Sequence, residues 1–269
     1  MDKITNLTRI EQKNSDDKSL KTFFYKTGNF LEILIILGIW VLIFKKAQIL
    51  GDYTREEIIT YIIFGNLLGV FSAYFMRRII AADLIKTDSK ILIYKPFRYF
   101  NYIISEGIKK FLAPFLITSL FYLVVVFVFI NEIIINFNIL YLTVIFLLVI
   151  LNFIIEFLLA YLINLFVFWT IESKDAYAFI VRIKRLLAGN YFPLDFLLPV
   201  FVSISLVFPF AYGFFVPMQI YLKKMTLTTG WVGAYIQLIW IIFLYLLIKI
   251  VWSKKHPLKN KVNPTYDKT

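Results

Sequence analysis

Long stretches without a charged residue dominate the middle of this chain. Residues 111–130 form a run of twenty residues with no charge, and residues 133–171 contain a single charged residue, Glu156. About twenty apolar residues are enough for a helix to cross the roughly 30 Å hydrocarbon core of a bilayer. Hydrophobic residues make up 60% of the chain, compared with about 45–50% in a typical soluble domain. The sequence therefore predicts an all-α polytopic membrane protein.

Basic residues fall into alternate loops, and this pattern predicts both a span count and an orientation. The apolar segments predict six membrane-spanning helices at 28–44, 58–80, 111–130, 138–170, a broken region within 176–217, and 231–252. The loops and tails on one side of this arrangement hold 24 Lys and Arg residues, and those on the other side hold 5. Because basic residues concentrate in cytoplasmic loops, we predict that both the N and C termini are cytoplasmic.

Two of these segments have unusual lengths. Residues 138–170 would form a helix of about 50 Å at 1.5 Å per residue, and no turn signal divides them. We interpret them as one tilted helix that extends beyond the membrane. The fifth helix has two candidate starts, near Ala176 or near Leu186, because basic residues precede its apolar part.

Four prolines interrupt an apolar stretch that is too long for one crossing. Residues 186–222 carry a single charge, Asp195, and would form a straight helix of about 55 Å. Broken backbone at membrane depth is tolerated only where it is buried in protein or lines a wet cavity. We therefore predict short re-entrant helices over 193–222 that dip into the outer leaflet and are separated at Pro199, Pro209 and Pro217. Asp195 is expected near the outer side, facing neighbouring protein or water.

The chain lacks the residues that several kinds of active site require. It contains no cysteine and one histidine, His256, in the polar C-terminal tail. These counts disfavour an intramembrane metalloenzyme and a Ser–His hydrolase. No G-x-x-x-x-G-K-[ST] phosphate loop is present, so we do not expect ATP to bind by that route. We attribute the net charge of +12 to the cytoplasmic face and predict no nucleic-acid partner.

Three stretches together resemble membrane permeases of the type-2 ABC exporter superfamily, in the bacterial branch that has two related permeases encoded beside an ATPase. They are GDYTREEIITYIIFGNLL at 51–68, KTDSKILIYKPFRYFNYIISEGIKK at 86–110, and AGNYFPLDFLLPVFVSISLVFPFAYGFFVPMQIYL at 188–222. The third stretch is the most specific, and the similarity covers nearly the whole chain from Leu20. Asp88 is a departure, since relatives often carry Gly at that position, and it puts only local loop geometry in doubt.

The resemblance implies a permease domain over 30–252, between a cytoplasmic segment (1–29) and a cytoplasmic tail (253–269). It implies assembly with separate ABC ATPase subunits and with a second permease, either the same chain or a sister. ATP and Mg²⁺ would bind to the ATPase, so no cofactor, metal or catalytic residue is expected here. In the family the re-entrant elements cap the outer exit of the path, which makes the expected gate residues Pro193, Asp195, Pro199, Pro209, Phe210 and Pro217.

Residues 81–110 form the largest predicted cytoplasmic loop. Its basic residues alternate with tyrosines, and Pro96 disfavours helical geometry for the residue before it, so a short helix would end near Tyr94. By resemblance this loop is the coupling helix that docks on the ATPase, whereas a basic segment lying on anionic lipid headgroups is the alternative. An interfacial helix at 16–29 has the same two interpretations. The expected coupling residues are Lys86, Lys90, Tyr94, Lys95, Pro96, Phe97 and Arg98.

Polar side chains within the predicted spans have both functional and structural interpretations. Asn152 and Glu156 lie one turn apart on one face of the 138–170 helix. They either line the transport path or form a hydrogen bond between helices. The basic group at 182–185 either receives an anionic substrate or marks the cytoplasmic end of the fifth helix.

Two local patterns in the second predicted span are structural. Thr54 and Glu57 have the spacing of a capping box, which starts a helix. Gly65 and Gly69 permit close approach of another helix, with dimer formation as one use of that space.

These observations favour a non-catalytic transmembrane subunit of an ABC exporter, with the path formed between two permeases of a bacterial or archaeal cytoplasmic membrane. A self-sufficient secondary transporter or lipid flippase is the alternative, although clear repeats and a mid-membrane ion site are missing. A membrane-embedded enzyme is disfavoured by the residue counts above. The aromatic, weakly charged spans suit amphipathic or hydrophobic cargo.

Overall fold

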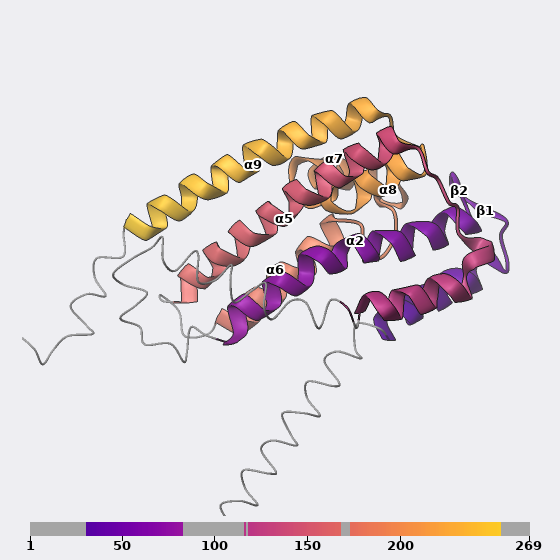
Figure 1. The fold of residues 1–269 in the computed structure, drawn as a ribbon, viewed down its shortest axis with the longest axis horizontal. Helices are drawn as coiled ribbons and strands as arrows, with labels where there is room; N and C mark the ends of the chain where they lie inside the picture. The colour runs from indigo at the N-terminus through magenta and orange to yellow at the C-terminus, as the bar shows by residue number, and fades with distance from the viewer. Residues whose placement is uncertain (1–30, 83–115, 117, 168–172, 254–269) are drawn as a thin grey trace, which may run out of the picture. The chain divides into compact units, whose positions relative to one another are not determined.

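The computed structural model describes residues 31–82, 116, 118–167 and 173–253, and these residues are mostly helical (Figure 1). The chain divides into two compact units, Met1–Arg55 and Glu56–Thr269. The predominantly helical fold class is confirmed, whereas the count of six spans and the side of the termini stay predictions.

The described part of the first unit is a helix followed by a short hairpin. The helix covers Leu31–Phe44, within the first predicted span. Strands β1 (Ile49–Leu50) and β2 (Tyr53–Thr54) pair antiparallel, with Ile49 opposite Thr54. Gly51 has a φ of 60° at the first position of the two-residue turn between them, where a type II′ hairpin requires glycine.

The described part of the second unit contains longer helices and, mostly between α6 and α9, short helical pieces. Its long elements are α2 (Arg55–Ala82, starting one residue before the boundary), the helix Thr118–Val128, α5 (Ile139–Val167), α6 (Ser173–Leu187) and α9 (Leu227–Ser253). The short ones are η1 (Ile130–Glu132), η2 (Leu194–Phe196), α7 (Pro199–Val207), η3 (Ala211–Gly213) and α8 (Phe215–Tyr221).

Several predicted boundaries can be compared directly with these helices. α2 begins immediately after Thr54, as the capping pattern predicts. α5 is a single helix over Ile139–Val167, so these residues form one helix and not a hairpin, as interpreted for 138–170. α6 begins at Ser173, so the start near Ala176 was the better of the two alternatives and the start near Leu186 was wrong.

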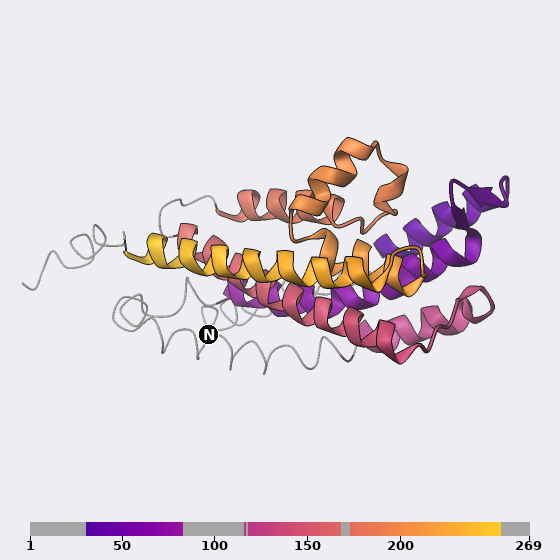
Figure 2. The ribbon, with the colours of Figure 1, turned by 90° about the horizontal axis from the view of Figure 1, so that it is seen from above.

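Among the described residues, two helices are long and apolar enough to cross a membrane by length and composition, within Ile139–Leu162 of α5 and Leu227–Val251 of α9. They run side by side in both views of the ribbon (Figures 1 and 2). Leu244 of α9 is buried in a cluster with Ile155 and Leu158 of α5. The buried face of α9 begins with two glycines, Gly230 and Gly233, whose missing side chains admit Val144 and Tyr212 respectively.

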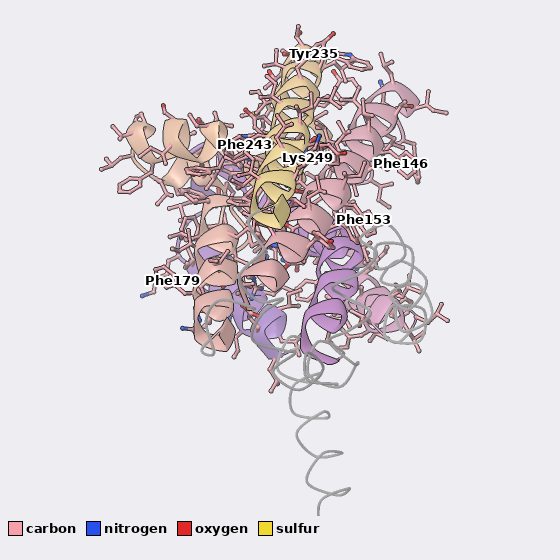
Figure 3. All side chains as sticks on the ribbon, turned by 90° about the vertical axis from the view of Figure 1, so that its left-hand side faces the viewer. Phe146, Phe153, Phe179, Tyr235, Phe243 and Lys249 are labelled. Atoms are coloured by element: carbon pink, nitrogen blue, oxygen red, sulfur yellow. The ribbon has the colours of Figure 1, made fainter. Side chains whose placement is uncertain are left out.

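The opposite face of α9 is apolar and exposed. Tyr235 and Phe243 expose 67% and 50% of their surface (Figure 3). Phe146 on α5 is also exposed, at 67%. A helix that is apolar on all sides needs an apolar environment on all sides, and the described residues leave this face of α9 exposed.

Two helix ends in this unit form Schellman motifs, in which two backbone N–H groups close over the last turn. At the end of α6, Gly189 N–H donates to Leu186 and Asn190 N–H donates to Arg185. At the end of α8, Lys223 N–H donates to Ile220 and Lys224 N–H donates to Gln219. The central residue has positive φ in both cases, 76° at Gly189 and 60° at Lys223.

Polar contacts connect three places: the start of α2, the segment before α5, and the end of α8. Thr60 Oγ1 accepts a hydrogen bond from the Ile134 N–H at 2.9 Å. Glu57 and Lys224 form an ion pair at 3.0 Å. Tyr221 Oη donates to the Ile134 carbonyl at 3.0 Å and accepts from the Asn136 N–H at 3.1 Å. These bonds join segments that are more than 70 residues apart.

The two Schellman motifs predict opposite effects of substitution. Gly189→Ala would place a methyl group in a left-handed conformation, 2.8 Å from the Tyr61 hydroxyl. We expect it to destabilise the fold by about 1–2 kcal/mol. Lys223→Gly removes the same kind of strain from an exposed residue, so it should raise the midpoint of thermal unfolding in detergent. A drop in that midpoint for Lys223→Gly would contradict this account of the turn.

Candidate functional site

The segment after α6 is a series of short helical pieces, as its prolines predict. Pro199 is the first residue of α7, and Pro209 lies between α7 and η3. Pro217 does not separate helices, because it is the third residue of α8 and is buried. The first turn of a helix needs no intrahelical N–H donors, so proline is tolerated there. The predicted break at Pro217 is therefore wrong, whereas the breaks at Pro199 and Pro209 are confirmed.

Side chains satisfy the backbone carbonyls where α7 ends. Tyr212 Oη donates to the Leu206 carbonyl at 2.8 Å. Trp240 Nε1 of α9 donates to the Val207 carbonyl at 3.0 Å. The ring of Phe208 stacks between Trp240 and Phe210, with centroid distances of 5.9 and 6.0 Å. The carbonyls in the last turn of a helix have no intrahelical partner. Here Tyr212 of η3 and Trp240 of α9 provide the missing donors.

Asp195 lies in η2 and is exposed. Its Oδ2 accepts a hydrogen bond from Nε2 of Gln219 at 2.6 Å. Gln219 belongs to α8 and is only 1% exposed. This bond joins the first and last pieces of the broken segment, a pairing that no sequence pattern predicts. Pro193, directly before η2, is buried.

Asn152 and Glu156 share one face of α5 and are both buried, at 7% and 5% exposure. Asn152 lies against η3, where a side-chain carbon added at Gly213 would overlap its amide. One turn earlier, the Leu148 carbonyl accepts a hydrogen bond from Gln237 of α9 at 3.2 Å. This face of α5 is therefore occupied by other segments of the same chain.

Glu156 forms an ion pair with Lys184 of α6. The Lys184 Nζ lies 2.7 Å from each carboxylate oxygen. The side chains are 7% and 19% exposed, so both charges are largely withdrawn from solvent. Isolated charges in such surroundings are costly, whereas a paired and hydrogen-bonded couple is tolerated. Of the two interpretations given to Glu156, the contact between helices describes its position in the structure.

The partner of Glu156 was not identified from the sequence, although a signal for it was present. Glu156 lies eleven residues before the end of α5 at Val167, and Lys184 lies eleven residues after the start of α6 at Ser173. Two antiparallel helices joined by a short link bring such equidistant residues to the same level, about 16 Å from the link. The start of α6 had to be known before this register could be counted.

The glycines of α2 face the broken segment of the same chain. The ring of Phe214 occupies the space that a side chain at Gly65 would need. The same ring meets Tyr61 edge-on, with centroids 5.5 Å apart. Tyr61 in turn donates to the Gly189 carbonyl at 2.8 Å. Gly65 does admit a close neighbour, but that neighbour is the ring of Phe214 from the broken segment and not the backbone of another helix.

The expected coupling residues Lys86 to Arg98 and the interfacial segment 16–29 lie outside the described residues. Among the described residues, no group of three or more His, Asp and Glu side chains is placed to hold a metal ion. The contacts that sequence reasoning missed are those made by Lys184, Gln219, Gln237 and Trp240.

The buried ion pair predicts strongly unequal effects of single and double substitutions. Lys184→Met leaves the Glu156 carboxylate without its partner, and we expect a destabilisation of about 3 kcal/mol. Glu156→Leu combined with Lys184→Met removes both charges and should cost much less. The measurement is thermal unfolding of the detergent-solubilised protein.

A more exposed ion pair serves as the control. Glu57 and Lys224 have side chains that are 19% and 21% exposed, so Lys224→Met should cost about 1 kcal/mol or less. Equal losses for Lys184→Met and its double variant would show that the charge of Glu156 needs no partner.

Comparison with known proteins agrees with this architecture. The family model described as ABC-2 family transporter protein matches residues 30–256. That range includes both candidate spans, the broken segment and the ion pair. No curated protein and no solved structure matches the chain. The family match covers most of the chain, which therefore belongs to the ABC-2 family of transporter proteins.

Proposed function

We propose that this chain is the transmembrane permease subunit of an ABC exporter, with six spans and both termini in the cytoplasm. The family match over residues 30–256 carries this proposal. The permease domain would cover 30–252, between a cytoplasmic segment (1–29) and tail (253–269), in a bacterial or archaeal cytoplasmic membrane. The chain itself would be non-catalytic.

The side chains along α9 support a position across the membrane. Trp231 and Tyr235 lie near its start, and both are exposed. Lys249 lies near its end (Figure 3) and is also exposed. Trp231 and Lys249 are 18 residues apart, or about 27 Å along a helix, which is close to the thickness of the hydrocarbon core. Aromatic rings and basic side chains favour the two interfaces.

The broken segment between α6 and α9 would form the re-entrant outer part of the permease. Gln219 and Tyr212 bond its short helical pieces to one another, and Trp240 of α9 bonds the end of α7 to the rest of the unit. Backbone satisfied in this way suits a position at membrane depth but away from lipid. Pro193, Asp195, Pro199, Pro209, Phe210 and Pro217 would then lie at the outer exit of the path.

ATP hydrolysis by a partner protein would drive transport. Separate ATPase subunits would bind ATP and Mg²⁺ and dock on the 81–110 loop, through Lys86, Lys90, Tyr94, Lys95, Pro96, Phe97 and Arg98. A second permease, identical or a sister, would complete the path. The Glu156–Lys184 pair satisfies its own charges, which supports an externally driven permease over a carrier that uses an unpaired intramembrane carboxylate as its ion site.

The orientation can be tested with single cysteines, because the chain has none of its own. Cysteine at Lys223 should react with a membrane-impermeant maleimide in intact cells, since the α8–α9 turn is predicted to be outside. Cysteine at Asp267, in the C-terminal tail, should react only after the membrane is opened. The reverse pattern would overturn the proposed orientation.

The coupling assignment predicts loss of the ATPase on substitution. A variant with Lys95→Ala, Pro96→Ala and Arg98→Ala should no longer retain the co-expressed ATPase during purification. A matched variant, Lys45→Ala with Lys46→Ala, changes basic residues on the opposite predicted side and should retain it. Undiminished assembly and ATP turnover in the first variant would rule out this loop as the docking site.

A further inference from the structure

The last turns of α6 hold three basic residues with different surroundings. Lys184 is paired with Glu156 at 2.7 Å. The Arg185 guanidinium lies over the ring of Tyr191, 5.1 Å from its centroid. Arg182 is exposed, and the described part of the chain supplies no hydrogen bond or ion pair to its guanidinium. Of these three basic residues, Arg182 is the one whose charge has no partner among the described residues.

Arg182 lies within an exposed apolar stripe. Phe179, Ile183 and Leu186 are 62%, 41% and 48% exposed, and their spacing of four and three residues places them on one side of the helix with Arg182. Exposed apolar residues of α7, among them Phe201 at 51%, add to this side. Figures 2 and 3 show α6 and α7 on the same side of the unit, with Phe179 at its margin.

The ion pair indicates how deep Arg182 lies. Glu156 is six residues before the end of the apolar span at Leu162, or about 9 Å along the helix. Lys184 lies at the same level as Glu156, and Arg182 lies two residues closer to the start of α6. Side chains on a helix lean toward its N-terminus, and long basic side chains extend to the interface while their stems stay in the apolar layer. The guanidinium is thereby directed to headgroup level.

We propose that Arg182 binds the phosphate of an anionic membrane lipid, whose acyl chain lies along Ile183 and Leu186. A guanidinium presents two parallel N–H donors that match a phosphate, with a charge of the opposite sign. The apolar stripe provides the surface that an acyl chain needs beside that headgroup. The lipid comes from the leaflet that contains the α5–α6 link, which is the inner leaflet in the proposed orientation.

A second copy of this chain is a poorer occupant of the same surface. In a two-fold symmetric contact, each stripe would meet the same stripe of the partner, so the interface would contain two Arg182 side chains. Between Phe179 and Leu187 the sequence contains no acidic residue to pair with them. A phosphate headgroup supplies the missing negative charge.

The test is native mass spectrometry of the purified full chain titrated with phosphatidylglycerol or phosphatidylcholine. We expect phosphatidylglycerol to bind more tightly to the unchanged protein. Arg182→Gln should weaken that binding by about tenfold or more, as expected for a charge-assisted hydrogen bond, and leave phosphatidylcholine unaffected. Arg182→Lys should retain part of the preference, because it keeps the charge but not the paired donors.

Lys249→Gln is the matched control, since Lys249 is an exposed basic residue beside apolar neighbours on α9. It should leave the tight site unchanged. Glycerol phosphate, which has the headgroup without the acyl chain, should compete weakly. Strong competition by glycerol phosphate would overturn the lipid assignment in favour of a soluble anion.

Two further results would overturn the proposal. One is unchanged phosphatidylglycerol binding in Arg182→Gln, or an equal loss in Lys249→Gln. The other is a shift in the ratio of monomer to dimer in Arg182→Gln with lipid binding intact, which would make a second permease the occupant. The assay contains no ATPase, so its failure leaves the coupling and orientation predictions unaffected.

Discussion

Backbone polar groups that lie in a hydrocarbon layer have to be bonded within the protein. In the described part of the chain, the segment between α6 and α9 is broken into short helices, and side chains bond several of its carbonyls. Two Schellman motifs close the ends of α6 and α8. Tyr61, Tyr212 and Trp240 donate to carbonyls of the segment. Tyr61 of α2 and Trp240 of α9 can donate because these two helices pack against the segment, whereas Tyr212 donates from within it.

Buried charged and polar side chains are likewise bonded within the protein. Glu156 and Lys184 neutralise each other between α5 and α6, and Gln219 bonds to Asp195 across the broken segment. Arg182 is exposed beside apolar residues, and the described part of the chain offers it no counter-charge. A lipid headgroup is the proposed source of that charge.

Much of the fold was predictable because it depends on local rules. The continuous apolar run of α5, the helix start after Thr54, and the breaks at Pro199 and Pro209 all follow from neighbouring residues. The prediction failed at Pro217, because a proline in the first turn of a helix gives the same sequence signal as one between helices. Gly65 was identified as a point of close approach for another helix, but its close neighbour is the ring of Phe214, almost 150 residues away.

The apolar, helical character of this chain, and roughly where its helices begin and end, can be predicted from the sequence, since composition and turn chemistry act over a few residues. Which polar groups meet depends on how the helices pack. Lys184 could be matched to Glu156 once the start of α6 was known, because the register of two antiparallel helices depends on that start. The bonds from Gln219, Gln237 and Trp240 cross between elements, and no local pattern encodes the distance between atoms on separate helices.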